Sequence, residues 1–169
     1  MTVPAVVWVL GSDSDLPHIQ DGLSALRELE IPFEVRILSA HRTPDAVDEL
    51  ARNARTRGVR VLIGVAGGAA HLPGVLAART TLPVIGVPVP TDLSGGLDSL
   101  LSIAQMPAGV PVASVGANKA GGRNAALLAA EILATSDERL AVALDAMRAE
   151  MSRAVLQRDR DKGRRVDER

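Results

Sequence analysis

Five short apolar runs, rich in β-branched residues and separated by amphipathic stretches, constrain the fold of this chain more than any other feature. They fall at residues 5–10, 33–38, 60–65, 82–87 and 110–115, and they predict five strands. Nearly continuous apolar strands are typical of a parallel sheet that is buried on both faces. Successive parallel strands need crossover connections, which place helices on both faces of the sheet. The pattern therefore predicts a three-layer, doubly wound α/β architecture.

The stretches between these runs have helical spacing. Apolar residues recur at steps of three and four through residues 16–29 and again through 44–57. After the fifth run, residues 124–133 and 137–157 predict two more helices, the second with Ser136 as a candidate N-cap. We therefore expect a flavodoxin-like domain with an extra C-terminal helix.

Length and charge limit the size of the fold and its partners. The 169 residues suit one domain, which we assign to residues 1–157, and the charged segment 158–169 is predicted to fray. With 19 basic and 20 acidic residues, the chain has no net field that would collect nucleic acid or an anionic membrane. No apolar run approaches the roughly 20 residues of a membrane span, and no basic signal-peptide region precedes the first run. We therefore expect a cytoplasmic protein that binds neither nucleic acid nor membrane.

The turn after the first predicted strand is the first candidate site. In an open parallel sheet, ligands bind beyond the carboxyl ends of the strands. There the chain reads Gly-Ser-Asp-Ser-Asp at residues 11–15. Free N–H groups, the positive end of a helix dipole and small hydroxyls favour a phosphate. The alternative is that Ser14 or Asp15 only caps the helix, and the turn matches neither a dinucleotide fingerprint nor a P-loop.

The turn after the second predicted strand adds proton chemistry. It reads Ser-Ala-His-Arg-Thr-Pro at residues 39–44. The guanidinium of Arg42 can fork onto phosphate oxygens, and an imidazole such as that of His41 can exchange protons near neutral pH. The alternative is a surface loop in which Thr43 caps the next helix.

Two further stretches have less distinctive chemistry. Residues 66–74 carry such small side chains that a planar ring could lie against the backbone. His71 stands among apolar residues there and is interpreted as a buried, neutral histidine, whereas His18 is assigned to the surface. The helical spacing of residues 94–107 indicates core or interface. The chain has no cysteine, its three histidines stand far apart and no G-x-S-x-G turn is present, so we expect no metal site and no serine hydrolase.

Taken in order, these turns resemble the PurE family, which makes carboxyaminoimidazole ribonucleotide in purine biosynthesis. The likeness spans about residues 6–133 and rests on the turns at 11–15, 39–44 and 67–74, together with Asp-Ser-Leu at 98–100, Gln-Met-Pro at 105–107 and Asn-Ala-Ala-Leu-Leu at 124–128. It implies an enzyme that assembles as a homo-octamer, with active sites at subunit junctions and the last helix packed on a neighbour. It also implies that no metal or organic cofactor is needed.

The resemblance also implies roles for individual residues. His41 is the catalytic residue, and phosphate and ribose are held by Ser12, Ser14, Asp15 and Arg42. The backbone of residues 67–70 lies along the aminoimidazole. The full predicted substrate-binding set is Ser12, Ser14, Asp15, Ser39, Arg42, Ala66, Gly67, Gly68, Ala70 and Leu72.

The family contains two classes, and the Gly-Gly-Ala-Ala-His-Leu-Pro turn looks like the class that acts as a mutase. A mutase moves carboxylate from N5 to C4 of its ribonucleotide by releasing CO₂, trapping it and recapturing it, with His41 as acid and then base. The alternatives are a carboxylase that uses free CO₂, a paralogue acting on another phosphoribosyl heterocycle, and a non-catalytic nucleotide-binding module. Residues 114–123 depart from the family's Ala-Ile-Gly-x-Ala-Gly pattern, which is why the paralogue remains open.

Overall fold

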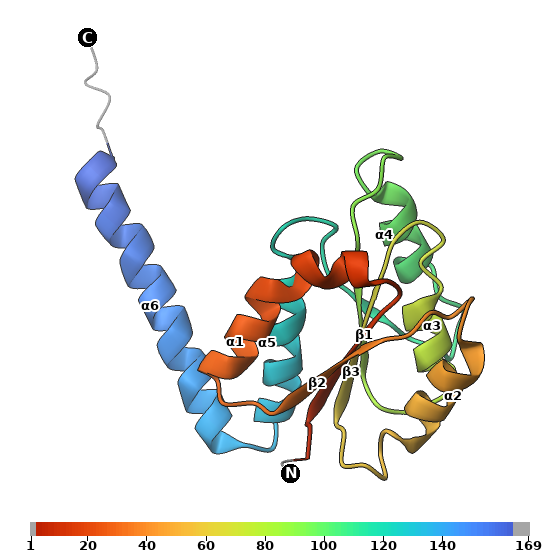
Figure 1. Ribbon diagram of the computed structural model, residues 1–169. Helices are drawn as coiled ribbons and strands as arrows, with labels where there is room; N and C mark the ends of the chain where they lie inside the picture. The colour runs from red at the N-terminus through yellow and green to blue at the C-terminus, as the bar shows by residue number, and fades with distance from the viewer. Residues whose placement is uncertain (1–2, 164–169) are drawn as a thin grey trace.

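A single parallel sheet forms the centre of the molecule. The computed structural model describes residues 3–163 (Figure 1). Its sheet has the order β2-β1-β3-β4-β5, and every neighbouring pair is parallel. The strands are β1 (Val6–Leu10), β2 (Phe33–Ile37), β3 (Val61–Ala66), β4 (Val84–Pro88) and β5 (Ala113–Ser114). The predicted five-stranded flavodoxin-like fold is confirmed, although the last strand is only two residues long.

Helices cover both faces of this sheet and complete three layers (Figure 1). One layer holds α1 (Gln20–Glu28), α5 (Gly121–Ala134) and α6 (Glu138–Lys162), and the other holds α2 (Pro44–Asn53), α3 (Leu72–Ala77) and α4 (Leu97–Ala104). A 3₁₀ helix, η1 (Asp13–Ile19), joins β1 to α1. Within residues 3–163, none of these helices combines the length and apolar character that crossing a membrane requires.

The core divides into two apolar clusters, one on each face of the sheet. Along β1, Val6, Trp8 and Leu10 face the cluster under α1 and α5, whereas Val7 and Val9 face the cluster under α2 and α3. All five side chains are fully buried. Burial on both faces explains why the central strands read as continuous apolar runs rather than as an alternating pattern.

Helix boundaries are where the sequence predictions fail. The helix predicted at 16–29 begins earlier, as η1, and Ser12 caps it rather than Ser14 or Asp15. Ser136 is likewise not the cap of α6, because the side chain of Asp137 accepts the Leu140 N–H at 3.2 Å. Helix α6 also continues through Lys162, into the segment predicted to fray. The rest of that segment, 164–169, lies outside the described residues.

Candidate functional site

Three turns meet in one cavity of about 370 Å³ at the carboxyl ends of β1, β2 and β3. The strand order explains the meeting, because β1 lies between β2 and β3 and all three point the same way. The cavity is lined by Gly11, Ser12, Asp15, Ser39, Ala40, His41, Arg42, Ala66, Gly67, Ala70, His71 and Leu72. Nine of the predicted site residues are therefore in contact with one space, whereas Ser14 and Gly68 do not line it, and Gly11, Ala40 and His71 were missed.

The first turn is held by a capping box. Ser12 Oγ accepts the Ser14 N–H at 3.3 Å, and Asp15 Oδ2 accepts the Ser12 N–H at 3.0 Å. Asp15 is only 7% exposed. This burial raises the pKa of the Asp15 carboxyl above its usual value, although the hydrogen bond from Ser12 acts in the opposite direction. Capping thus fixes these two side chains at the cavity wall.

The second turn is closed on itself and tied to the first. Ser39 Oγ accepts the backbone N–H groups of His41 and Arg42 at 3.3 and 3.2 Å. The Thr43 hydroxyl bonds both the N–H and the carbonyl oxygen of Ser39, and makes no capping bond to α2. The Arg42 guanidinium donates through Nη2 to the Gly11 carbonyl oxygen at 2.8 Å. Arg42 therefore joins the second turn to the first.

The two histidines of the cavity face one another. His41 Nε2 lies 2.8 Å from His71 Nδ1, and the rings meet edge to face with centroids 4.9 Å apart. One hydrogen must lie between these two nitrogens, since a bond of this length needs one donor and one acceptor. The interpretation of His71 as a buried histidine is wrong, because it occupies the N-cap position of α3 and is exposed. Its place in a turn that follows a strand, like that of His41, is the signal that could have found it.

The third turn presents backbone to the cavity. The Gly67 carbonyl oxygen accepts the Ala70 N–H at 3.2 Å, and Gly68 and Ala70 both have positive φ, 65° and 44°. Ala66, Ala70 and Leu72 are buried beneath it and supply an apolar wall. The arrangement can hold an anion at one end, a flat ring along the other, and exchange protons between them.

The stretch at 114–123 does not line this cavity. It leads from β5 into α5, and the Asn118 side chain accepts the Ala120 N–H at 2.9 Å. Across residues 3–163, no group of three or more histidine and acidic side chains is arranged to hold a metal ion.

Comparisons with known proteins agree with one another. The family model described as AIR carboxylase matches residues 5–154. The N5-carboxyaminoimidazole ribonucleotide mutase of Bacillus subtilis is 53% identical over 91% of this chain and 95% of its own, and that of Mycobacterium leprae is 54% identical over 94% and 91%. The crystal structure of Treponema denticola PurE superposes with a TM-score of 0.86 at 28% identity, covering 95% of this chain and 99% of the other.

Proposed function

This chain belongs to the AIR carboxylase family, and from that premise we propose that it is an N5-carboxyaminoimidazole ribonucleotide mutase of purine biosynthesis. The observation that carries the mechanism is a single cavity in which a phosphate-binding turn, an apolar wall and two imidazoles meet. Similarity to curated mutases over nine-tenths of the chain supports the choice of reaction.

The phosphate and ribose bind at the first and second turns. The forked guanidinium of Arg42 and the hydroxyl of Ser12 suit phosphate oxygens. Ser14 does not line the cavity, and its hydroxyl donates to Ser12 Oγ at 2.9 Å. The Asp15 carboxylate would repel a phosphate, so it accepts a ribose hydroxyl instead. Because the Arg42 guanidinium is held by the Gly11 carbonyl oxygen, a contact that needs no substrate, little ordering is left for substrate binding to accomplish.

The aminoimidazole lies along the third turn. The Gly67 to Ala70 backbone offers hydrogen-bonding groups at the edge of the ring, and Ala66 and Leu72 contact its face. Ser39 also lines the cavity, and its hydroxyl can donate its hydrogen to the carboxylate or to the CO₂ released from it. Holding CO₂ beside C4 makes its recapture an intramolecular event, which is the largest contribution that positioning can make here.

His41 moves the proton in both halves of the reaction. As the bond from N5 to the carboxylate carbon breaks, His41 gives its proton to N5, and CO₂ leaves. C4 then attacks CO₂ and forms the new carbon–carbon bond, and His41 takes the C4 proton to restore the aromatic ring. His71 fixes the orientation of the His41 ring during this exchange, because its Nδ1 lies 2.8 Å from His41 Nε2.

A substrate assay separates the mutase from its alternatives. The purified protein should consume N5-carboxyaminoimidazole ribonucleotide rapidly, and aminoimidazole ribonucleotide with bicarbonate only slowly. Rapid turnover of the second mixture alone would establish the CO₂-using carboxylase. Binding of another phosphoribosyl heterocycle, with neither mixture consumed, would establish the paralogue.

A variant pair separates the enzyme from a non-catalytic binding module. His41→Asn should lose turnover by several orders of magnitude and keep its affinity for product, because the phosphate contacts are untouched. His18→Asn is the matched control, since His18 lies on η1 and does not line the cavity. Unchanged turnover in His41→Asn would refute the assignment.

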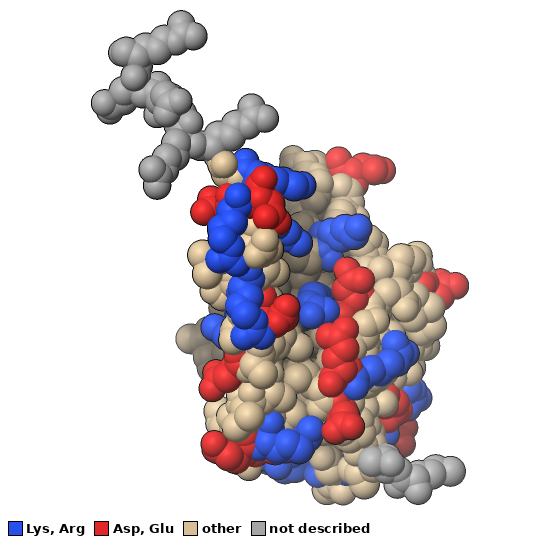
Figure 2. Space-filling model, turned by 90° about the vertical axis from the view of Figure 1, so that its left-hand side faces the viewer, with Lys and Arg blue, Asp and Glu red and all other residues tan. Residues whose placement is uncertain are grey.

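We also propose that the protein assembles as a homo-octamer. Helix α6 extends away from the body, and four of its large apolar side chains, Val142, Met151, Val155 and Leu156, are between 54% and 60% exposed (Figure 1). The face that carries α6 shows both basic and acidic side chains, with groups of each sign next to one another (Figure 2).

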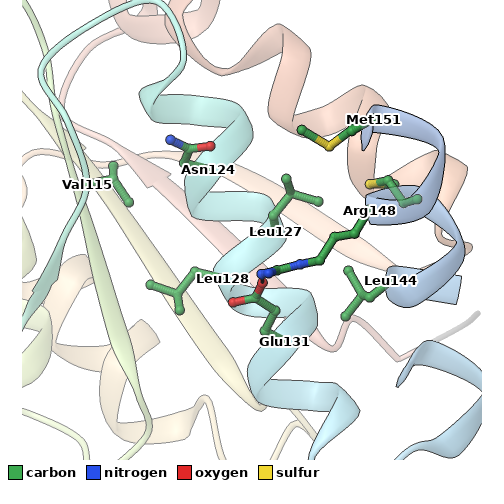
Figure 3. A pocket seen from close by; sticks show the side chains of 9 residues that line it. Val115, Asn124, Leu127, Leu128, Glu131, Leu144, Arg148 and Met151 are labelled. Atoms are coloured by element: carbon green, nitrogen blue, oxygen red, sulfur yellow. Dashed lines mark hydrogen bonds and ion pairs between the residues drawn. The ribbon is translucent and has the colours of Figure 1, made fainter. Parts of the chain in front are cut away.

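A groove between α5 and α6 is the second support for assembly. Its volume is about 590 Å³, and its walls are mainly aliphatic and methionine side chains, with one ion pair between Arg148 and Glu131 (Figure 3). A second copy of this chain is the partner that the family resemblance implies, and light scattering that reports a monomer at working concentration would refute it. A cytoplasmic location remains part of the proposal, and cell fractionation tests it.

A further inference from the structure

We infer that Ser99, which does not line the cavity, is a positioning residue that fixes the peptide between Gly67 and Gly68 against the substrate ring. The role of that peptide rests on the proposed function, whereas its attachment to Ser99 rests on the structure alone. Ser99 lies in the first turn of α4, and its side chain is fully buried.

The peptide needs fixing because it joins two glycines. Residues 67–70 form a tight turn in which the Ala70 N–H reaches the Gly67 carbonyl oxygen and Gly68, the second residue, has a φ of 65°. Glycine adopts positive and negative φ with similar ease, so a peptide flanked by two glycines can turn over at little cost. Such a flip would exchange a donor for an acceptor at the wall of the cavity.

Ser99 prevents that flip through two hydrogen bonds. Its hydroxyl donates its single hydrogen to the Val89 carbonyl oxygen at 2.8 Å, which leaves a lone pair to accept the Gly68 N–H at 2.9 Å. The peptide is therefore held at both ends, at its carbonyl oxygen by Ala70 and at its N–H by Ser99. The buried hydroxyl thus both donates and accepts a hydrogen bond, and burying a hydroxyl costs little free energy when it is paired in this way.

The segments behind Ser99, which are the ends of β3 and β4 and the start of α4, form a frame that is held by hydrogen bonds of its own. The Val89 N–H donates to the Ala66 carbonyl oxygen at 2.9 Å, so the ends of β3 and β4 are joined beside the turn. Thr91 Oγ1 donates to Asp98 Oδ1 at 2.6 Å and ties the start of α4 to the segment that follows β4. Ser99 thus connects the cavity wall to a helix whose own attachment is independent of the substrate.

The competing interpretation is that Ser99 only attaches α4 to the sheet. Two control variants address it. Thr91→Val removes a neighbouring hydrogen bond in the same frame and keeps the side-chain shape. Ser102→Ala removes an exposed hydroxyl from the same helix, and among residues 3–163 that hydroxyl has no hydrogen-bond partner.

The test compares Ser99→Ala with these controls by steady-state kinetics, product binding and hydrogen exchange of the segment 67–72. We expect Ser99→Ala to lower kcat about 10- to 100-fold, because small misplacement of reacting groups has effects of this size. Product affinity should change less than about threefold, since the phosphate is held by other turns, and exchange of the segment should accelerate at least about tenfold. Both controls should stay within about twofold of wild type.

Three results would overturn the inference. One is wild-type exchange and turnover in Ser99→Ala. Another is a loss of kcat in Thr91→Val as large as that in Ser99→Ala, because that would show that Ser99 only attaches α4 to the sheet. If the alanine variant does not fold, Ser99→Cys replaces it, since a thiol fills the space but is a weak acceptor, and unchanged exchange there refutes the role. Accelerated exchange in a protein that does not consume the mutase substrate would refute the proposed function and leave this attachment standing.

Discussion

The contact between α1 and α5 allows a prediction in which two physical effects oppose each other. Gly22 lies in α1, and replacing it with alanine should stabilise the helix by about 1 kcal/mol on intrinsic propensity alone. The structure predicts the opposite sign. A methyl group at Gly22 would overlap the carbonyl oxygen of Gly122 in α5 and would lie 2.9 Å from the ring of Trp8.

The size of the effect follows from what would have to move. One obstacle is backbone and the other is a fully buried ring, so the two helices must separate. Overpacking typically costs about 1–3 kcal/mol, and we take the upper end because neither neighbour can rotate away. Subtracting the propensity gain leaves a net loss of about 2 kcal/mol in the free energy of unfolding. For a chain of this length, that lowers the unfolding midpoint by about 4–8 °C.

Gly74→Ala is the matched control, because Gly74 is also helical but its added methyl would meet only the flexible end of Met106, at 3.1 Å. Its midpoint should stay level or rise slightly. Both variants are measured by thermal unfolding at one protein concentration, since the proposed assembly would make the midpoint concentration-dependent. A Gly22→Ala protein as stable as wild type would show that the helices are not in close contact and would refute the packing argument.

Three other substitutions test the site and the assembly. Arg42→Lys keeps the charge but loses the fork, so calorimetry should show product binding weakened about 10- to 100-fold, with Arg52→Lys on α2 unaffected. Burial raises the pKa of Asp15 above 3.8, so the folded state favours the protonated acid and loses stability as pH rises from that value through the raised one. Over this pH interval the unfolding midpoint of Asp15→Asn should therefore rise relative to that of wild type. A difference between the two midpoints that does not change with pH would contradict the burial argument. Leu156→Lys, at an exposed apolar position on α6, should shift sedimentation toward smaller species, and an unchanged profile would exclude that face from the interface.

The strands and the first two turns could be predicted because their signals are local. β-branched runs mark buried strands, and parallel strands carry the turns that follow them to one edge of the sheet. Local sequence was therefore enough to predict which residues of the first two turns lie together at that edge. They are Ser12, Asp15, Ser39, His41 and Arg42. Local sequence was not enough to place the N-caps or the length of the last strand, because those depend on which hydrogen bonds the ends of each element find.

The hydrogen-bond partners of His71 and Ser99 could not be predicted because they are distant in sequence. His71 bonds a residue 30 positions away, and Ser99 bonds one 31 positions away. Apolar neighbours in sequence indicated a buried imidazole, yet the start of α3 turns that ring toward the cavity while Leu72 and Pro73 point inward. Periodicity likewise assigned Ser99 to a core or interface helix and gave no hint of its two hydrogen bonds.

These distant partners also hold the three turns of the cavity together through contacts within the chain. Arg42 joins the second turn to the first, the His41 and His71 rings join the second to the third, and Ser99 joins the third to the frame of β4 and α4. Each turn is thus held by a residue from another segment of the chain. Groups that share such a network couple when they are changed together. Removing two links to the same turn, such as those of His71 and Ser99 to the third, should therefore cost less turnover than the product of the two single losses, since the first removal already releases the turn that the second was holding.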